Sequence, residues 1–232
     1  MGKPWRWRGS FARSYHPGSL WVLDEAGRVV EMDELRHVNR LGDDGIMADS
    51  DALILVDEAD RRLGSLSKEA CHEGRGVLHR AFSLLIFNGR GELLVQQRAP
   101  SKRLWPLYWS NSCCSHPRST ESMEAATQRR LYEELGICCP LEFLFKFQYH
   151  AQFDETGAEH ELCSVFIGRC DDPVEVNPQE IHDWRWMPPD ALEREMCSSV
   201  DSRCRYTPWF VLEWTRIWRN YRPAVLALSP PP

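Results

Sequence analysis

Apolar runs separated by polar turns predict a set of strands through the middle of the chain. The continuous run over 81–87 (AFSLLIF) predicts a central strand, because a strand buried on both faces is apolar throughout. The Asn88-Gly89 turn then leads back into a partner strand over 92–98 (ELLVQQR). Three more strands are expected, over 141–152, 159–169 and 182–187, with the turn 154–157 joining the first two.

Helical signals occur in three places. Ser67 opens a short helical turn that ends near His72, and residues 121–135 predict a longer helix. Thr207 followed by Pro208 predicts the start of a last helix. Its core-packing face is expected to carry Phe210, Trp214, Ile217 and Tyr221. Since strands and helices mix without regular alternation, an α+β domain with αβα layers is favoured over a doubly wound sheet.

The first 50 residues differ from the rest. Residues 1–17 are basic and aromatic, which suits either a nucleic-acid arm or an ordinary terminus lying along the domain surface. The segments 20–28 (LWVLDEAGR) and 53–61 (LILVDEADR) each predict a hairpin, by duplication or by chance, and 33–50 predicts a helix end and a surface loop. We therefore expect an N-terminal extension over 1–50, a domain over 51–228 and a tail over 229–232.

Composition narrows the class of protein. The chain has 232 residues, a formal net charge of −6 and a pI of about 5.8, so it has no electrostatic footprint for nucleic acid and suits a small-molecule substrate. Its nine cysteines follow no disulfide or zinc-ribbon spacing, which favours reduced thiols. Without a membrane-length apolar run or a secretory leader, we expect a cytoplasmic enzyme. The oligomeric state is unreadable, and a monomer is compatible with the sequence.

Two acids in the predicted strand 159–169 suggest a metal site. Glu159 and Glu161 lie two apart, so their carboxylates share one strand face while His160 points away. Two such carboxylates repel each other unless a cation lies between them. A divalent ion held with the imidazoles of His72, His79 and His116 is one solution, and manganese, magnesium and zinc all suit these ligands. The alternative is that the histidines are solvated and the acids protect an edge strand.

The helix 121–135 carries a second pattern. Ser115, Glu121, Arg129, Arg130 and the following residues through Ile137 have the spacing of the Nudix box, GX5EX7REUXEEXGU, and agree at seven of its nine defined positions. Ser115 stands where the motif has Gly, and Arg130 where it has the first helical Glu. Arg130 suits a diphosphate oxygen better than a metal. Diphosphate binding is therefore expected, while hydrolysis becomes doubtful.

Several motifs together resemble one family, the type 1 isopentenyl-diphosphate isomerases, which have a Nudix-type fold. The resemblance runs from about residue 53 to residue 221 and rests on HEGRGVLHRAFS, LLVQQRAPSKRLWP, WSNSCCSHP, RRLYEELG, the EHE strand and TPWF. It implies an enzyme of isoprenoid biosynthesis that interconverts isopentenyl and dimethylallyl diphosphate by a 1,3-allylic proton shift. Its partner would be the small isoprenyl diphosphate, with no nucleic acid, membrane or organic cofactor.

The resemblance also implies roles for particular residues. Cys114 matches the catalytic thiol, Glu161 the acid–base group opposite it, Tyr149 its assistant and Trp209 a ring facing the reacting carbons. The diphosphate contacts match Lys68, Arg98, Lys102 and Arg130. The metal ligands match His72, His79, His116, Glu159 and Glu161, with Glu134 matching a ligand of a second, substrate-bound magnesium. We also count Cys114 among the metal-site residues. Cys113 is expected to point away from Cys114 and pack.

The implied chemistry passes through a cation-like state in a dry pocket. Glu161 is expected to deliver a proton and Cys114 to accept one as thiolate, which requires the thiol pKa to fall from about 8.5. Trp209 would stabilise the cation through its ring face. Two other readings remain: a Nudix pyrophosphohydrolase, which Arg130 disfavours, and a binding module that has kept the fold without activity.

Overall fold

The computed structural model describes residues 21–23, 29–31, 52–198 and 205–228, and the side chains of the last two ranges. The chain forms two compact units, 1–48 and 49–232. In the first unit, β1 (Trp21–Leu23) pairs antiparallel with β2 (Val29–Glu31), so the first of the two expected hairpins is formed. The expected arm 1–17, the loop 33–50 and the tail 229–232 lie outside the described residues.

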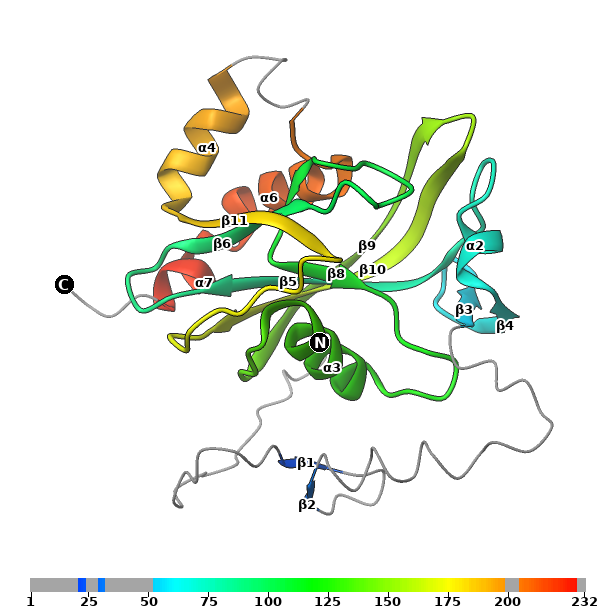
Figure 1. The fold of residues 1–232 in the computed structure, drawn as a ribbon, viewed down its shortest axis with the longest axis horizontal. Coiled ribbons are helices and arrows are strands. Elements are labelled where there is room, and N and C mark those ends of the chain that lie inside the picture. The colour runs from blue at the N-terminus through cyan, green and yellow to red at the C-terminus, as the bar shows by residue number, and fades with distance from the viewer. Residues whose placement is uncertain (1–20, 24–28, 32–51, 199–204, 229–232) are drawn as a thin grey trace. The chain divides into compact units, whose positions relative to one another are not determined.

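The second unit is built on a mixed nine-stranded sheet (Figure 1). Its central path runs β11-β6-β5-β10-β9, where β5 and β10 are parallel and the other neighbours antiparallel. The bounds of these strands are β5 His79–Phe87, β6 Leu93–Arg98, β9 Leu141–Asp154, β10 Gly157–Arg169 and β11 Ile181–Met187. All five strands were expected from the apolar runs, and their observed ends differ from the expected ends by about two residues at most.

Helices cover both faces of the sheet (Figure 1). On one face lies α3 (Met123–Leu135), which packs Ala126, Leu131 and Leu135 against Phe82, Leu84 and Ile86 of β5. The other face carries α4 (Pro189–Ser198), α6 (Pro208–Asn220) and α7 (Arg222–Ala227). Because β5 is apolar on both faces, it supplies side chains to both cores. The expected α+β class with a mixed sheet is confirmed.

Shorter elements complete the sheet. The hairpin β3 (Leu53–Val56) and β4 (Arg62–Leu66) extends the sheet beside the start of β5. It is followed by α2 (Lys68–Cys71), whose N-cap is Ser67 and whose C-cap is His72, as expected. Two strands that the pattern did not predict, β7 (Trp109–Ser110) and β8 (Cys113–Ser115), pair with β6 and β5.

The C-terminal helices differ from the expectation in two respects. The helix α4 was not predicted; it follows Pro188 and buries only Leu192 and Met196. The last helix begins at Pro208 after Thr207, as expected, and Phe210, Trp214 and Ile217 are fully buried. It ends at Asn220, however, and Tyr221 is its C-cap, because Pro223 lies in the first turn of α7. The Tyr221 ring still packs, stacked on Phe145 at a centroid distance of 5.1 Å.

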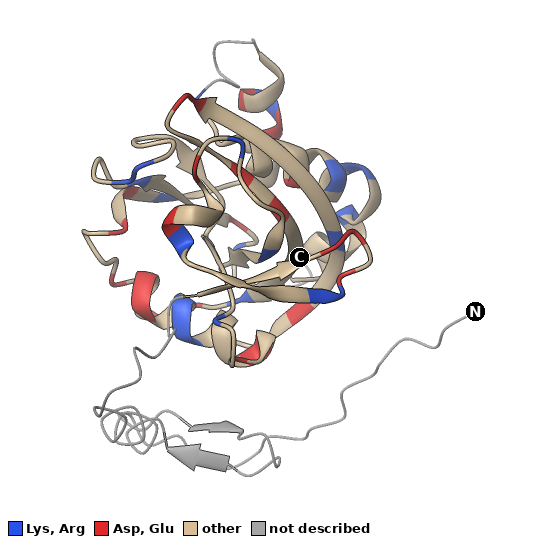
Figure 2. Ribbon diagram, turned by 90° about the vertical axis from the view of Figure 1, so that its right-hand side faces the viewer, with Lys and Arg blue, Asp and Glu red and all other residues tan. Residues whose placement is uncertain are grey.

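Acidic and basic residues alternate over the ribbon of the second unit (Figure 2). Among the described residues, no helix is both long and apolar enough to cross a membrane.

Candidate active site and metal centre

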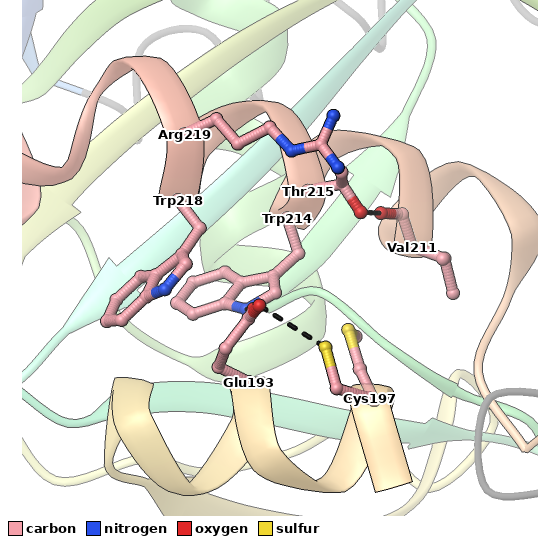
Figure 3. Close-up of a pocket in the computed structure, with 8 residues that line it drawn as sticks. Glu193, Cys197, Val211, Trp214, Thr215, Trp218 and Arg219 are labelled. Atoms are coloured by element: carbon pink, nitrogen blue, oxygen red, sulfur yellow. Dashed lines mark hydrogen bonds between the residues drawn. The ribbon is translucent and has the colours of Figure 1, made fainter. Parts of the chain in front are cut away.

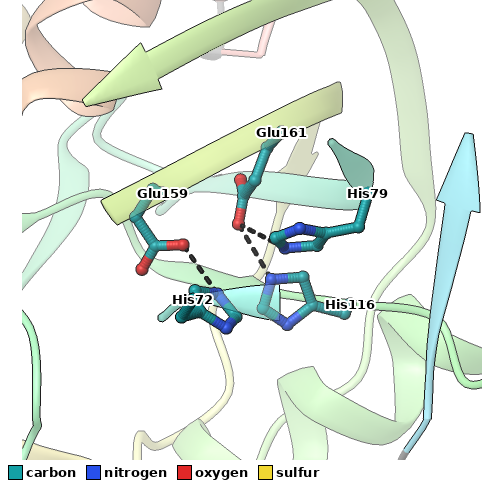
Figure 4. A group of neighbouring side chains, drawn as sticks. All are labelled: His72, His79, His116, Glu159 and Glu161. Atoms are coloured by element: carbon teal, nitrogen blue, oxygen red, sulfur yellow. Dashed lines mark hydrogen bonds and ion pairs between the residues drawn. The ribbon is translucent and has the colours of Figure 1, made fainter. Parts of the chain in front are cut away.

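Five side chains from four parts of the chain converge at one end of β5 and β10 (Figure 4). His79 is the first residue of β5 and lies in register with Glu161 of β10. Glu159 lies two residues before Glu161 on the same face of β10. His72 caps α2, and His116 follows β8. The ligand atoms of all five lie within 4.8 Å of one another. We call these residues, His72, His79, His116, Glu159 and Glu161, the His/Glu cluster.

Close contacts organise the cluster into two carboxylate groups. The Nε2 atom of His116 lies 2.8 Å from Glu161 Oε1, and that of His79 lies 3.7 Å from the same oxygen. His72 Nε2 lies 2.8 Å from Glu159 Oε2. The three imidazole ring centroids are 4.8 to 5.2 Å apart. All five side chains are at most 11% exposed, so solvent screens little of their mutual interaction.

The donor set fits a divalent metal ion. His79 Nε2 and Glu159 Oε2 are buried and have no partner in hydrogen-bonding geometry within the described chain. The opposite ring nitrogens are fixed by backbone carbonyls: Nδ1 of His72 lies 2.6 Å from Lys68 O and Nδ1 of His79 lies 2.7 Å from Val77 O. Such contacts turn the Nε2 lone pairs inward, as metal-binding histidines require.

The turn between β9 and β10 holds His72 in place. The backbone N–H of Ala158 donates to the His72 carbonyl at 3.1 Å. A Cβ atom added at Gly157 would lie 2.1 Å from that carbonyl oxygen, so only glycine allows this approach. Gly157 is therefore part of the support for the cluster.

Burial and charge act against each other within the cluster. Burial lowers the pKa of His116 to about 3, although Glu161 opposes this. Burial also tends to lower the pKa of His72, but the Glu159 carboxylate beside it reverses the direction and raises that pKa. Glu161 is buried, yet His116 and His79 hold its pKa well below the usual range. Glu161 is thus an ionised carboxylate.

The alternative explanation of the two acids as edge protection is wrong. Strand β10 lies between β5 and β9 in the interior of the sheet, and Glu159 and Glu161 are 8% and 7% exposed. His160 points to the other face, as expected, where its ring contacts His150 at 5.1 Å. The paired acids therefore point into a closed site.

Beside Glu161, the residues expected to act on the substrate form a wall. Tyr149 lies in register with Glu161 and donates its hydroxyl hydrogen to Glu161 Oε2 at 2.7 Å. The Tyr149 and Trp209 rings lie 6.1 Å apart, and both belong to the core that Cys114 packs against. On β8, Cys114 lies in register with Ser83 of β5. Cys113 is buried in the core on the opposite face of the sheet. The expected divergence of the two cysteines is confirmed.

The surroundings of the Cys114 thiol act on its pKa in opposite directions. Burial raises the pKa to about 12. Arg98 opposes this rise, whereas the carboxylates of Glu134, Glu161 and Glu213 add to it. The protein's own groups therefore do not lower the thiol pKa, and the expected fall stays a prediction that depends on a bound cation.

The four basic residues expected to contact a diphosphate occupy different positions. Arg98 donates to the carbonyls of Trp105 and Leu104 at 3.0 and 2.9 Å, and its guanidinium lies 5.3 Å from the Trp209 ring centroid. The side chain of Lys68 is on the exposed first position of α2.

Lys102 and Arg130 meet at a shared acid. Both form ion pairs with Glu180, which the sequence reasoning did not single out. Arg130 also pairs with Glu133 and with the buried Glu134.

Comparison with known proteins places this geometry in a family. Residues 77–205, more than half of the chain, match the NUDIX domain. Isopentenyl-diphosphate Delta-isomerase 1 of Photorhabdus laumondii is 44% identical over 171 residues, which cover 73% of this chain and 96% of that protein. The isopentenyl-diphosphate Delta-isomerase of Pectobacterium atrosepticum is 39% identical, and the match covers 73% of this chain and 94% of that protein.

The chain belongs to the isopentenyl-diphosphate Delta-isomerase family of Nudix proteins. The fold agrees, since the crystal structure of DR0079 from Deinococcus radiodurans superposes with a TM-score of 0.52 at 24% identity, covering 67% of this chain and 99% of that one. The recognition made from the SNSCCSHP, EHE and TPWF motifs is confirmed.

The Nudix helix shows how this family member departs from the Nudix box. Arg129 and Glu121, which both match the box, form a two-pronged ion pair with contacts of 2.6 and 2.8 Å. Glu121 also accepts from the backbone N–H of Arg118 at 3.1 Å, so this pair fastens the preceding loop to α3. Arg130, which departs from the box, instead faces Glu134 and Glu180. The matching Arg pairs with the loop before the helix, whereas the departing Arg pairs with acids of α3 and with Glu180.

A buried acid in α6 was also missed by the sequence reasoning. Glu213 is fully buried and accepts the Ser83 hydroxyl hydrogen at 2.7 Å. Burial raises the pKa of Glu213 to about 8. It lies one helical turn after Trp209, and this i, i+4 spacing was the available signal. Burial thus favours the protonated form of the Glu213 side chain.

A separate pocket of about 170 Å³ lies between α4 and α6 (Figure 3). Trp214 Nε1 donates to Glu193 Oε2 at 3.1 Å across it. Its lining contains none of the site residues; it consists of Glu193, Met196, Cys197, Val211, Trp214, Thr215, Trp218 and Arg219. It is not part of the isomerase site.

Proposed function

We propose that this protein interconverts isopentenyl diphosphate and dimethylallyl diphosphate. The observation that carries the proposal is the set of contacts made by Glu161. Its carboxylate accepts from the Tyr149 hydroxyl and lies beside His116, and its charge raises the pKa of the Cys114 thiol. The named relatives, which match over nearly their whole length, support the same reaction. The substrate partner is a small isoprenyl diphosphate.

The reaction adds one proton to C4 of isopentenyl diphosphate and removes one from C2, so it needs one donor and one acceptor. Cys114 and Glu161 are proposed to supply this pair from opposite sides of the substrate. The group that starts protonated gives its proton to C4, and the group that starts ionised takes the proton that leaves C2. One turnover therefore exchanges the protonation states of the two groups, and proton exchange with each other or with water must restore them before the next turnover.

The His/Glu cluster is proposed to hold a divalent cation. Bound there, the ion would supply positive charge beside Glu161 and fix its carboxylate. Manganese, magnesium and zinc each suit three imidazoles and two carboxylates. Glu134, which is 3% exposed and lies against Arg130, is proposed to bind a magnesium ion that arrives with the diphosphate.

Aromatic side chains protect the cation-like state. The Trp209 ring is 3% exposed and lies between Trp105, at a centroid distance of 5.2 Å, and Tyr149. A desolvated ring face stabilises a cation by about 2 kcal/mol, equivalent to about 30-fold in rate. The same packing excludes water, which would otherwise trap the cation as an alcohol. Lys68, Arg98, Lys102 and Arg130 are proposed to hold the diphosphate.

Incubation of the protein with isopentenyl diphosphate and Mg²⁺ in deuterated water tests the proposal. We expect dimethylallyl diphosphate to form, with deuterium entering the methyl and C2 positions of substrate and product, and expect Cys114→Ala to abolish both. Mass spectrometry and proton NMR measure the two outcomes. Absence of isomer and label at saturating metal would refute the isomerase proposal, and release of phosphate would indicate a hydrolase instead.

A further inference from the structure

Glu180 bridges two basic side chains that come from different elements. Its Oε2 forms an ion pair with Lys102 Nζ, and its Oε1 lies 3.1 Å from Arg130 Nη2. Lys102 lies in the loop after β6, and Arg130 on α3. Each carboxylate oxygen therefore takes one cation, and the bridge joins the loop to the helix. We call these three residues the Lys102–Glu180–Arg130 bridge.

The backbone around Glu180 is fixed. The Glu180 carbonyl accepts the Ala99 N–H at 2.9 Å, and the Glu180 N–H donates to Asn177 O at 3.0 Å. The next residue, Ile181, begins β11 and lies in register with Arg98 at the end of β6. The carboxylate thus projects from a rigid corner of the sheet, whereas its two partners are long side chains with many rotamers.

The two cations favour the ionised form of Glu180. Burial alone would raise its pKa, but Lys102 and Arg130 outweigh burial and lower the pKa to about 2. Without this anion, the two cationic heads would repel each other across the space between loop and helix. The bridge holds them side by side.

The two cations differ in the donors that they leave unpaired. A Lys ammonium has three N–H donors, and Glu180 is the partner found for Lys102 among the described residues. The Nη1 and Nη2 atoms of Arg130 contact Glu133, Glu134 and Glu180, and its Nε is buried without a hydrogen-bond partner in the described part of the chain. Lys102 therefore has donors for a further anion, whereas Arg130 must exchange one of its carboxylate contacts for the substrate.

We infer that Glu180 is a positioning residue for diphosphate binding, which holds Lys102 and Arg130 at a fixed separation so that both donate to one diphosphate. This inference rests on the proposed function, which assigns the two cations to the substrate. It makes Glu180 favourable to anion binding despite its negative charge, and more important for a diphosphate than for a monophosphate, which does not span two cations.

The test compares Glu180→Gln with wild-type enzyme in isomerase kinetics and in calorimetric binding of Mg-pyrophosphate. We expect the Gln variant to raise the KM for isopentenyl diphosphate and the pyrophosphate Kd by about 10-fold, with kcat within about 2-fold. Inorganic phosphate affinity should change less. Glu92→Gln is the matched control, because Glu92 pairs with the exposed Arg90 in the β5–β6 turn.

The outcomes separate a positioning role from the others. Glu180→Asp keeps the charge on a shorter side chain and should restore part of the affinity. A KM or Kd that falls in Glu180→Gln would make Glu180 a competitor of the substrate, and unchanged values would make it structural only; either result overturns the inference. If wild-type protein binds pyrophosphate but makes no isomer, the proposed function fails while the binding data still decide the role of Glu180.

Discussion

The two groups of side chains proposed to bind opposite charges are built differently. The His/Glu cluster uses short side chains that start from paired strands and a helix cap, so hydrogen-bonded backbone fixes them within 4.8 Å of one another. The Lys102–Glu180–Arg130 bridge uses long side chains from a loop and a helix, and an added carboxylate holds them. Short ligands can thus be preorganised by the backbone, while long cationic side chains need their own counter-charge.

The His/Glu cluster and the bridge also differ in how much each depends on a bound ion. The His/Glu cluster has two carboxylates and buried atoms without a hydrogen-bond partner among the described residues, so we expect it to gain from an added cation. The bridge carries two positive charges and one negative charge, and it needs no ion to hold together, because Glu180 already pairs with both cations. We therefore expect the cluster to depend on metal and the bridge to keep its shape without a ligand.

The largest effect is expected from Glu161→Gln, which changes the cluster and the reacting carboxylate at once. The variant should lose about 10²–10⁴-fold in kcat, because the amide cannot accept a proton, and should also lose bound metal. Cys114→Ala is the control, since it should lose comparable activity but keep its metal. Elemental analysis of both purified variants measures this. Equal metal content in the two would mean that Glu161 is no ligand.

A smaller effect is expected from Gly157→Ala, which tests the rigidity of the cluster without touching a ligand. The added Cβ would lie 2.1 Å from the His72 carbonyl and must displace that backbone. Loss of such support typically lowers metal affinity about 10–100-fold. Gly64→Ala is the control, because a Cβ there meets nothing within 4 Å. Metal affinity is measured by competition with a chelator, and equal affinity in both variants would show that His72 can move freely.

The sequence predicts the His/Glu cluster and the bridge unequally. Strand alternation places Glu159 and Glu161 on one face, but the histidines that join them depend on long-range pairing such as that of β5 with β10, and the family resemblance implied them. Glu180 had no such signal, because its role depends on a turn that brings it to Lys102, 78 residues away in sequence. The effect of the protein's own groups on the Cys114 pKa was not predictable either, since burial follows from packing and not from neighbouring residues in the sequence.

The smallest effect is expected from Arg129→Gln, which separates the two adjacent arginines of α3. Arg129 binds Glu121 through contacts of 2.6 and 2.8 Å, so its loss should destabilise the loop before α3. Losing such a charged pair costs about 1–3 kcal/mol, and each kcal/mol lowers Tm by about 2–4 °C in a chain of this size. Thermal unfolding measures this shift.

Pyrophosphate calorimetry on the same samples completes the comparison between neighbours. Arg130→Gln should weaken binding, because Arg130 shares Glu180 with Lys102 and so belongs to the bridge. Arg129→Gln should bind as wild type does, because Arg129 pairs with Glu121 and Glu133, which are not part of the bridge. Equal weakening by both substitutions would mean that α3 contributes general positive charge, and that the pairing of each arginine does not decide its role.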